Sequence, residues 1–221
     1  MFKTDVYIPS LIELLKHTYH ERLLYVGLQG SYLRGEANEQ SDIDIMVVID
    51  DISVNDLDEY RKAIDSLDGY DKSCGFICGL EEIQRWNPLE ICHLIHSTKD
   101  YFGILSSLVP KYKDDDVRNF VKMSLGNLYH EICHRYIHAS KEKNIAKIPY
   151  AYRSVFFILQ NLHYLDSGSF FNTKKELLEE LSGKDKLVLE TAIFLGEAVE
   201  FDFDEVFALL FSWCKETMVR L

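Results

Sequence analysis

The sequence lacks several features that whole classes of proteins need. No apolar run approaches the roughly 20 residues that a membrane-spanning helix requires, so no membrane partner is expected. Positive charge is scarce, with 24 Lys and Arg against 36 Asp and Glu and a net charge of −12. Nucleic-acid polymers are bound through basic surfaces that contact phosphates. The balance therefore argues against a DNA or RNA substrate and favours a cationic small molecule, although most acidic surfaces only face solvent.

Cysteine is present without the spacing that gives it a special role. The five cysteines form no Cys-x-x-Cys pair, and their number is odd. The first residues show no secretory signal. We therefore expect reduced core cysteines and a cytoplasmic protein.

Two short apolar runs, 23–28 and 43–49, stand out in the first quarter of the chain. Both are aliphatic or β-branched and bounded by polar or turn residues, which predicts buried strands. Gly30 and Ser31 follow the first run, where the next helix would begin. Free backbone N–H groups and the helix dipole attract anions there, and the serine hydroxyl adds a donor. The dipeptide therefore predicts a phosphate-binding turn.

Ten residues after this turn comes Asp42-Ile43-Asp44. Side chains alternate along a strand, so Asp42 and Asp44 share one face while Ile43 and Ile45 point into the core. Two carboxylates about 6–7 Å apart along a strand can hold a pair of Mg²⁺ ions for phosphoryl displacement. The pattern predicts a metal-bound nucleoside triphosphate. The plainer alternative is a strand with two exposed aspartates after an ordinary turn.

The two segments Gly-Ser-Tyr-Leu-Arg-Gly and Ser-Asp-Ile-Asp-Ile resemble the signature of the DNA polymerase β-like nucleotidyltransferase superfamily. Within it, the sequence is most similar to the minimal and the kanamycin-type aminoglycoside nucleotidyltransferases. The resemblance implies that Gly30, Ser31 and Arg34 hold the triphosphate. It also implies that Asp42 and Asp44 bind two Mg²⁺ ions and are catalytic.

The rest of the pattern predicts an α+β protein with a nucleotidyltransferase-type mixed sheet, followed by an all-α helical bundle. Strands are expected at 72–78 and 89–96, and helices at 10–20, 55–67 and 81–86, the last closed by Asn87-Pro88. After Pro110 only helices are expected, at 116–140, 151–165, 173–181, 184–200 and 204–221, with Asp204 as an N-cap. We place the boundary in the charged run that follows Pro110. This predicts a core domain at 1–112 and a substrate-binding helical bundle at 113–221.

The first helix of the bundle carries chemistry on one face. Its predicted buried stripe consists of Val121, Leu125, Leu128, Ile132, Tyr136 and Ala139. The opposite arc consists of Ser124, Asn127, Glu131, Arg135 and His138. Such a helix either meets solvent or lines a cleft.

His130-Glu131-Ile132-Cys133-His134 also matches the His-Glu-x-x-His zinc-protease motif. A third ligand is needed, but His138 lies about 12 Å along the helix from His130. We therefore disfavour this alternative and expect no structural zinc.

The family resemblance gives the helix another role. In kanamycin-type enzymes a glutamate of the helical half is the general base, and a basic residue one turn later lies near the phosphates. Glu131 and Arg135 match this pair, although the family residue is lysine and arginine contacts phosphate differently. The expected third strand lacks an acidic residue that many relatives carry, which gives Glu131 more weight. An ordinary surface ion pair between Glu131 and Arg135 is the alternative.

Together these features predict an enzyme that transfers a nucleoside monophosphate from a Mg²⁺-bound nucleoside triphosphate to a hydroxyl of a small molecule. The expected donor is ATP, and the group transferred is then AMP. The sequence does not identify the acceptor, and an aminoglycoside-like compound is one candidate. An antitoxin-like enzyme that modifies a protein, or a non-catalytic nucleotide-binding module, remains an alternative. A homodimer is also open, since relatives can build the site across two chains and Glu131 would then act in trans.

Overall fold

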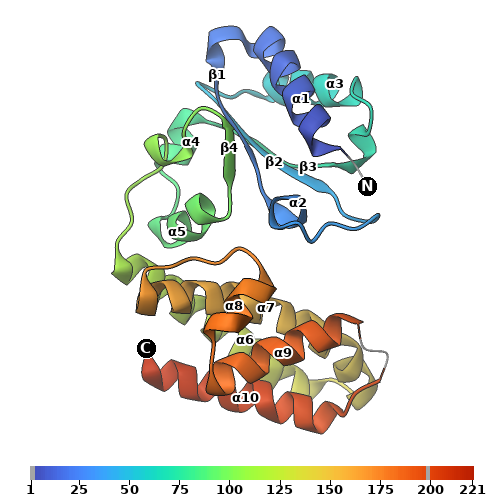
Figure 1. The fold of residues 1–221 in the computed structure, drawn as a ribbon, viewed down its shortest axis with the longest axis vertical. Helices are drawn as coiled ribbons and strands as arrows, with labels where there is room; N and C mark the ends of the chain where they lie inside the picture. The colour runs from blue at the N-terminus through green and yellow to red at the C-terminus, as the bar shows by residue number, and fades with distance from the viewer. Residues whose placement is uncertain (1–2, 198–199) are drawn as a thin grey trace. The chain divides into compact units, whose positions relative to one another are not determined.

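A computed structural model describes residues 3–197 and 200–221. The chain forms two compact units, Met1–Tyr112 and Lys113–Leu221 (Figure 1). We call them the N-terminal unit and the helical unit.

The N-terminal unit is built on a four-stranded mixed sheet with strand order β3-β2-β1-β4. Its strands are β1 (Leu23–Leu28), β2 (Ile43–Ile49), β3 (Ser73–Gly79) and β4 (Lys99–Phe102). Strand β1 runs antiparallel to β2 and β4, whereas β2 and β3 are parallel. The predicted α+β class, with a mixed sheet followed by a helical region, is confirmed.

Helices cover both faces of this sheet (Figure 1). They are α1 (Thr4–Tyr19), α2 (Gly30–Arg34), α3 (Val54–Asp65), α4 (Leu80–Gln84) and α5 (Pro88–His96), with 3₁₀ turns at His20–Arg22, Tyr70–Lys72 and Leu105–Ser107. Alternation along β2 divides the core. Ile43, Ile45 and Val47 pack in the cluster with α1, and Met46 and Val48 pack in a second cluster with Ile83 of α4.

The expected strand at 89–96 is wrong, because this segment forms helix α5. Asn87 is its N-cap and accepts a hydrogen bond from the backbone N–H of Leu89 at 3.1 Å, and Pro88 occupies the first turn. Proline suits that position because its missing N–H would have no helical partner there. Asn87-Pro88 therefore begins a helix rather than only closing the previous one. The fourth strand is Lys99–Phe102, in which Tyr101 and Phe102 pack against the core and which pairs with β1.

The helical unit contains α6 (Asp114–His138), α7 (Lys141–Ser167), α8 (Lys174–Glu180), α9 (Gly183–Glu197) and α10 (Phe203–Arg220). Helix α7 begins ten residues before its predicted start and includes Pro149. Asp202, not Asp204, caps α10, accepting from the backbone N–H groups of Asp204 and Glu205. The end of the predicted helix at 184–200 includes residues 198 and 199, which lie outside the described residues.

Two residues of the predicted buried stripe of α6 are misplaced. Val121, Leu125, Leu128 and Ile132 are buried as expected, but Tyr136 is 53% exposed, and Ala139 is half-buried at the C-cap. The ring of Tyr136 stacks on Phe207 of α10, with centroids 4.4 Å apart. In the part of the chain that the structure describes, no helix is both long and apolar enough to cross a bilayer.

Candidate active site

The Gly-Ser turn and the Asp-x-Asp segment meet at one end of the β1–β2 pair. Just past β1, the backbone N–H of Gln29 donates to the carbonyl of Asp44 at 2.8 Å. Gly30 then begins α2 with φ of +70°, a conformation that favours glycine, and a Cβ added there would overlap the carboxylate of Asp44. The backbone of the turn therefore lies directly against the Asp44 side chain.

Both aspartates lie at the start of β2. Asp42 is exposed and Asp44 is half-buried, whereas Ile43 and Ile45 are fully buried. Alternation puts the Asp44 side chain on the same face as Met46 and Val48. The carboxylates therefore project from the sheet while the isoleucines anchor the strand.

Arg34 lies at the other end of the short helix α2, whose N-terminal turn contains Ser31. Gly35 caps this helix in the left-handed conformation, and the backbone N–H of Glu36 donates to the carbonyl of Ser31 at 2.9 Å. The turn brings the Glu36 carboxylate 3.0 Å from Nε of Arg34. A phosphate that contacts Arg34 therefore competes with Glu36 for the guanidinium.

Strand β3 carries a cysteine at the position where an acidic residue could add a third carboxylate to Asp42 and Asp44. The parallel register sets Cys74 beside Asp44, and paired residues of neighbouring strands face the same side of a sheet. Cys74 is exposed and is one of five free cysteines. Among the described residues, no group of three or more His, Cys, Asp or Glu side chains is arranged to hold a metal ion.

The donor chemistry of the aspartate pair fits a hard divalent cation. Mg²⁺ takes oxygen ligands and completes its coordination with substrate phosphates and water. Asp42 and Asp44 offer only carboxylate oxygens, and Asp44 is held against the turn expected to bind the phosphates. Two protein carboxylates with a triphosphate are therefore a suitable donor set for Mg²⁺.

His93 was not predicted as a site residue, yet α5 places it close to Arg34. Burial, the positive charge of Arg34 and the neighbouring His96 lower the pKa of His93 to about 4. The imidazole is therefore neutral at physiological pH and can donate or accept a hydrogen bond beside the guanidinium. His93 reaches this position because residues 88–96 form a helix. The prediction of a strand at 89–96 therefore gave no sign that His93 lies near Arg34.

An acidic hollow of about 470 Å³ lies beside α4 and α5. It is lined by Glu81, Glu82, Arg85, Trp86, Asn87 and Glu90. Nε1 of Trp86 donates to Oε2 of Glu90 at 2.6 Å, and the indole stacks on Phe76 with centroids 6.0 Å apart. The hollow combines a fixed aromatic surface with negative charge, which suits a cationic group.

Glu131 and Arg135 lie one turn apart on α6 of the helical unit. Arg135 uses Nη2 to donate to the carbonyl of Lys143 at 2.9 Å, and none of the ion pairs in the described residues joins it to Glu131. Glu131 is exposed. The structure therefore does not contain the alternative, a surface ion pair between Glu131 and Arg135. Because Glu131 is exposed, it is accessible to a substrate.

The three histidines of α6 are exposed and follow one another along the helix. The ring centroids of His130 and His134 are 5.9 Å apart, and those of His134 and His138 are 4.8 Å apart. They do not form a three-ligand group. The expectation that no structural zinc is present stays a prediction.

Comparisons with known proteins give the class to which this site belongs. Residues 10–82 match the family model of the nucleotidyltransferase domain. No curated protein matches the chain significantly. The crystal structure of spectinomycin adenyltransferase AAD(9) from Enterococcus faecialis with ATP and spectinomycin is similar to this chain, with 15% sequence identity and a TM-score of 0.57. The match covers 96% of this chain and 100% of that one.

A toxin-antitoxin structure with AMP-PNP matches with 22% identity over 58% of this chain and 92% of that one, at a TM-score of 0.33. That score is too low to support an argument. The likeness to the adenyltransferase shows a shared fold. With the domain match, which contains the Gly-Ser turn and both aspartates, it identifies the class as nucleotidyltransferase enzymes. Together they support the assignment of residues 10–82 to a DNA polymerase β-like nucleotidyltransferase domain.

Proposed function

We propose that the protein transfers AMP from ATP to a hydroxyl of a small molecule and releases pyrophosphate. The carrying observation is the contact between the Gly30 backbone and the Asp44 carboxylate. The turn proposed to bind phosphates therefore lies against the carboxylate proposed to bind a cation. Nucleotidyl transfer needs that combination, because the α-phosphate must be held and its charge neutralised while a nucleophile attacks.

Each candidate site residue of the N-terminal unit has a role in this proposal. The backbone N–H groups of the turn and the hydroxyl of Ser31 hold phosphate oxygens, and Arg34 leaves Glu36 to pair with the triphosphate. Asp42 and Asp44 would hold Mg²⁺, which when bound neutralises charge on the phosphates. Positioning and electrostatic stabilisation therefore account for most of the catalysis.

Glu131 is the proposed general base, and Arg135 is a proposed nucleotide-binding residue. As the acceptor oxygen bonds to the α-phosphorus, its proton passes to the Glu131 carboxylate and the bond between the α- and β-phosphates breaks. Glu131 is exposed, and no ion pair with Arg135 holds it. Whether Glu131 acts in its own chain or, in a homodimer, on the partner's substrate depends on assembly.

The proposed acceptor is a cationic hydroxyl compound, of which an aminoglycoside-like molecule is one form. The acidic hollow around Trp86 supports a cationic ligand. The N-terminal unit as a whole has 19 Asp and Glu against 10 Lys and Arg. The adenyltransferase that shares the fold is described with ATP and spectinomycin.

Calorimetry and product analysis test this function together. We expect ATP to bind with Mg²⁺ or Mn²⁺ and to lose affinity in excess EDTA, and we expect Asp42→Asn/Asp44→Asn to lose the metal dependence. Asp50→Asn/Asp51→Asn, two exposed acids after β2, is the matched control. Equal ATP affinity with and without EDTA would remove the metal argument.

The same preparation separates the alternatives. Pyrophosphate release that needs a small polycation supports the proposed acceptor, whereas AMP attached only to a co-purified protein supports antitoxin-like modification. Metal-dependent ATP binding without any transfer supports a nucleotide-binding module. All three share the N-terminal site and differ in the acceptor.

A further inference from the structure

Three histidines on one helix of the helical unit have no role in the proposed function. His130, His134 and His138 follow one another at intervals of four residues along α6, and all three are exposed. Histidines at i and i+4 lie on the same side of a helix, where one metal ion can bind both rings. The zinc-protease motif pairs His130 with His134, but His134 and His138 have the same spacing. The ring separations distinguish these two pairs.

The distance between the rings favours the second pair. Two imidazoles that bind one square-planar or tetrahedral metal ion at about 2.0–2.1 Å have ring centroids about 4.5–5.2 Å apart. The centroids of His134 and His138 are 4.8 Å apart, within this range, whereas those of His130 and His134 are 5.9 Å apart. The end of α6 therefore holds His134 and His138 at a separation that suits a shared metal ion.

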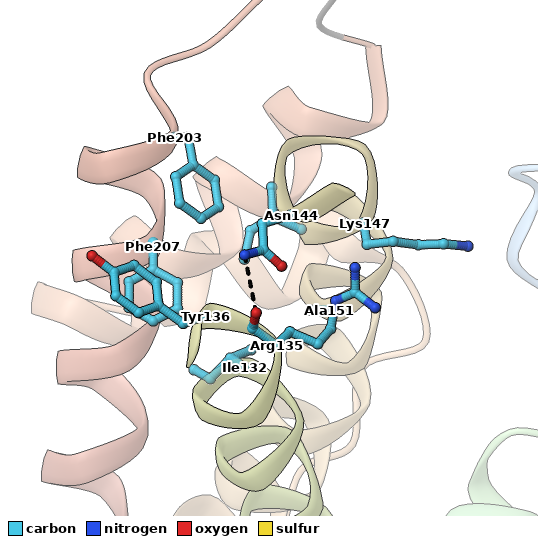
Figure 2. Close-up of a pocket in the computed structure, with 9 residues that line it drawn as sticks. Ile132, Arg135, Tyr136, Asn144, Lys147, Ala151, Phe203 and Phe207 are labelled. Carbon is cyan, nitrogen blue, oxygen red and sulfur yellow. Dashed lines mark hydrogen bonds between the residues drawn. The ribbon is translucent and has the colours of Figure 1, made fainter. Parts of the chain in front are cut away.

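The turn of α6 that carries this pair is fixed to the neighbouring helices. Nδ2 of the buried Asn144 on α7 donates to the carbonyl of Arg135 at 3.1 Å, the bond drawn as a dashed line in Figure 2. Nη2 of Arg135 in turn donates to the carbonyl of Lys143 at 2.9 Å. Tyr136, also in Figure 2, stacks on Phe207 of α10. Arg135 and Tyr136 lie between the two histidines in the chain, so the backbone under the pair is already ordered. A metal ion that binds there loses little affinity to ordering of the helix.

The electrostatic surroundings favour a cation at this end of the helix. His138 is the last residue of α6, where the negative end of the helix dipole attracts positive charge. Glu131 is exposed and lies one turn before His134 on the same side of the helix. Within the described residues, no hydrogen bond or ion pair engages the ring nitrogens of His134 or His138. Both rings can therefore offer a nitrogen lone pair to a metal ion.

The ligand type limits the kind of metal. Imidazole nitrogen suits Cu²⁺, Ni²⁺ and Zn²⁺, whereas Mg²⁺ takes oxygen ligands. The described residues contain no group of three or more His, Cys, Asp or Glu side chains that could hold a metal ion, so water would complete the coordination. A structural zinc centre uses four protein ligands. A site with two histidines is therefore of a different and more open kind.

We propose that His134 and His138 form a two-histidine site for a divalent transition-metal ion, with Cu²⁺ bound more strongly than Ni²⁺ or Zn²⁺. This inference goes beyond the proposed function and does not depend on it. The site lies entirely within the helical unit, and it needs neither ATP nor an acceptor. Its metal belongs to a different class from the Mg²⁺ expected at the aspartate pair.

Calorimetry with Ni²⁺ tests the proposal on the full chain without a polyhistidine tag. Excess Mg²⁺ is kept in the buffer because it competes for carboxylates but not for imidazoles. We expect about one Ni²⁺ to bind per chain, and His134→Gln/His138→Gln to weaken binding at least about tenfold. His17→Gln/His20→Gln is the matched control, because these rings are also exposed but their centroids are 6.2 Å apart. This control should leave the affinity unchanged.

Two further measurements locate the metal. His130→Gln should keep the Ni²⁺ affinity, whereas the single change His138→Gln should reduce it. Electron paramagnetic resonance of bound Cu²⁺ should show coupling to two imidazole nitrogens, and His134→Gln/His138→Gln should remove this signal. The Cu²⁺ experiment uses a Cys74→Ser background, because an exposed thiol can reduce Cu²⁺. Far-UV circular dichroism checks that each variant is folded.

Each outcome supports or overturns the site. No Ni²⁺ binding in excess Mg²⁺, or equal affinity of the wild type and His134→Gln/His138→Gln, would overturn it. Loss of affinity with His130→Gln but not with His138→Gln would also do so, since the other pair would then bind the metal. Unchanged Ni²⁺ binding by Asp42→Asn/Asp44→Asn supports a separate site. Because no step of the assay needs ATP or turnover, a failure of the proposed AMP transfer would leave this result unaffected.

Discussion

The two units present their reactive side chains in different ways. In the N-terminal unit the candidate site lies at strand ends, where the backbone of Gly30 is pressed against Asp44. In the helical unit Glu131 lies on the exposed face of a helix whose opposite face packs in the core. Strand ends fix a site through backbone pairing, whereas helix faces allow charges to change at little cost in stability.

Charge separates the units as well. The N-terminal unit has 19 acidic and 10 basic side chains, whereas the helical unit has 17 and 14. The unit expected to bind the triphosphate is thus the more acidic one. Divalent cations would offset this charge, which is consistent with the expected metal dependence.

Glu131→Gln gives the largest expected effect and tests whether a helix face supplies chemistry. The amide keeps shape and hydrogen bonding but cannot accept the acceptor proton, so transfer should fall about 10²–10⁴-fold. ATP affinity, measured by calorimetry, should stay nearly unchanged. Glu179→Gln, an exposed glutamate of α8, is the control. Unchanged transfer by Glu131→Gln would confine the reaction to the N-terminal unit.

Asp56→Asn is expected to destabilise only the N-terminal unit. The Asp56 side chain is buried, accepts from Nη1 of Arg22 at 2.8 Å and from Oγ of Ser53 at 2.6 Å, and these bonds lower its pKa to about 2. Losing the charge should cost about 2–3 kcal/mol. The chain has two tryptophans, Trp86 and Trp213, one in each unit.

Fluorescence of single-tryptophan variants therefore follows each unit separately during denaturant unfolding. In the Trp213→Phe background, Trp86 reports on the N-terminal unit, and Asp56→Asn should lower the denaturant midpoint. In the Trp86→Phe background, Trp213 reports on the helical unit, and Asp56→Asn should leave the midpoint unchanged. Asp58→Asn, an exposed acid on the same helix, is the control. Equal shifts from both reporters would mean that the units unfold together.

Gly30→Ala and Gly35→Ala form a matched pair with a smaller expected effect. Both glycines have φ near +70°, but only at Gly30 would a Cβ overlap the Asp44 carboxylate, whereas nothing lies within 4 Å at Gly35. Each change costs about 1–2 kcal/mol in backbone strain. Only Gly30→Ala should also weaken metal-dependent ATP binding, by about tenfold in calorimetry. Similar affinities for the two variants would show that the contact does not matter for binding.

The smallest effect concerns pH. Because burial and Arg34 lower the pKa of His93 to about 4 from an ordinary value near 6.5, the unfolded chain takes up the proton first. Stability is complete above about pH 6.5 and falls as pH decreases toward 4, by about 1–2 kcal/mol at pH 5. Denaturant unfolding with Trp86 as reporter should show this loss, and His93→Asn should reduce it. His138→Asn, in the helical unit, should not change it.

Short sequence patterns correctly predicted those strands and helices that the nearby residues by themselves favour. The runs at 23–28 and 43–49 are strands because β-branched and aliphatic residues bounded by turns have few other packings. The segment 89–96 was wrongly predicted as a strand because a short apolar run has no decisive period. Its Asn-Pro start was a helix signal taken for a helix end. Residues 99–102 are too few to show a strand period, and their pairing with β1 makes them a strand.

From the sequence by itself, the motif spacing between two expected strands predicted that Gly30, Ser31, Asp42 and Asp44 form one site. Only the tertiary structure showed that the Gly30 backbone touches the Asp44 carboxylate, that Cys74 lies beside Asp44, and that His93 lies near Arg34. These contacts join segments far apart in the chain. Their geometry depends on sheet register and helix packing, which no local pattern encodes.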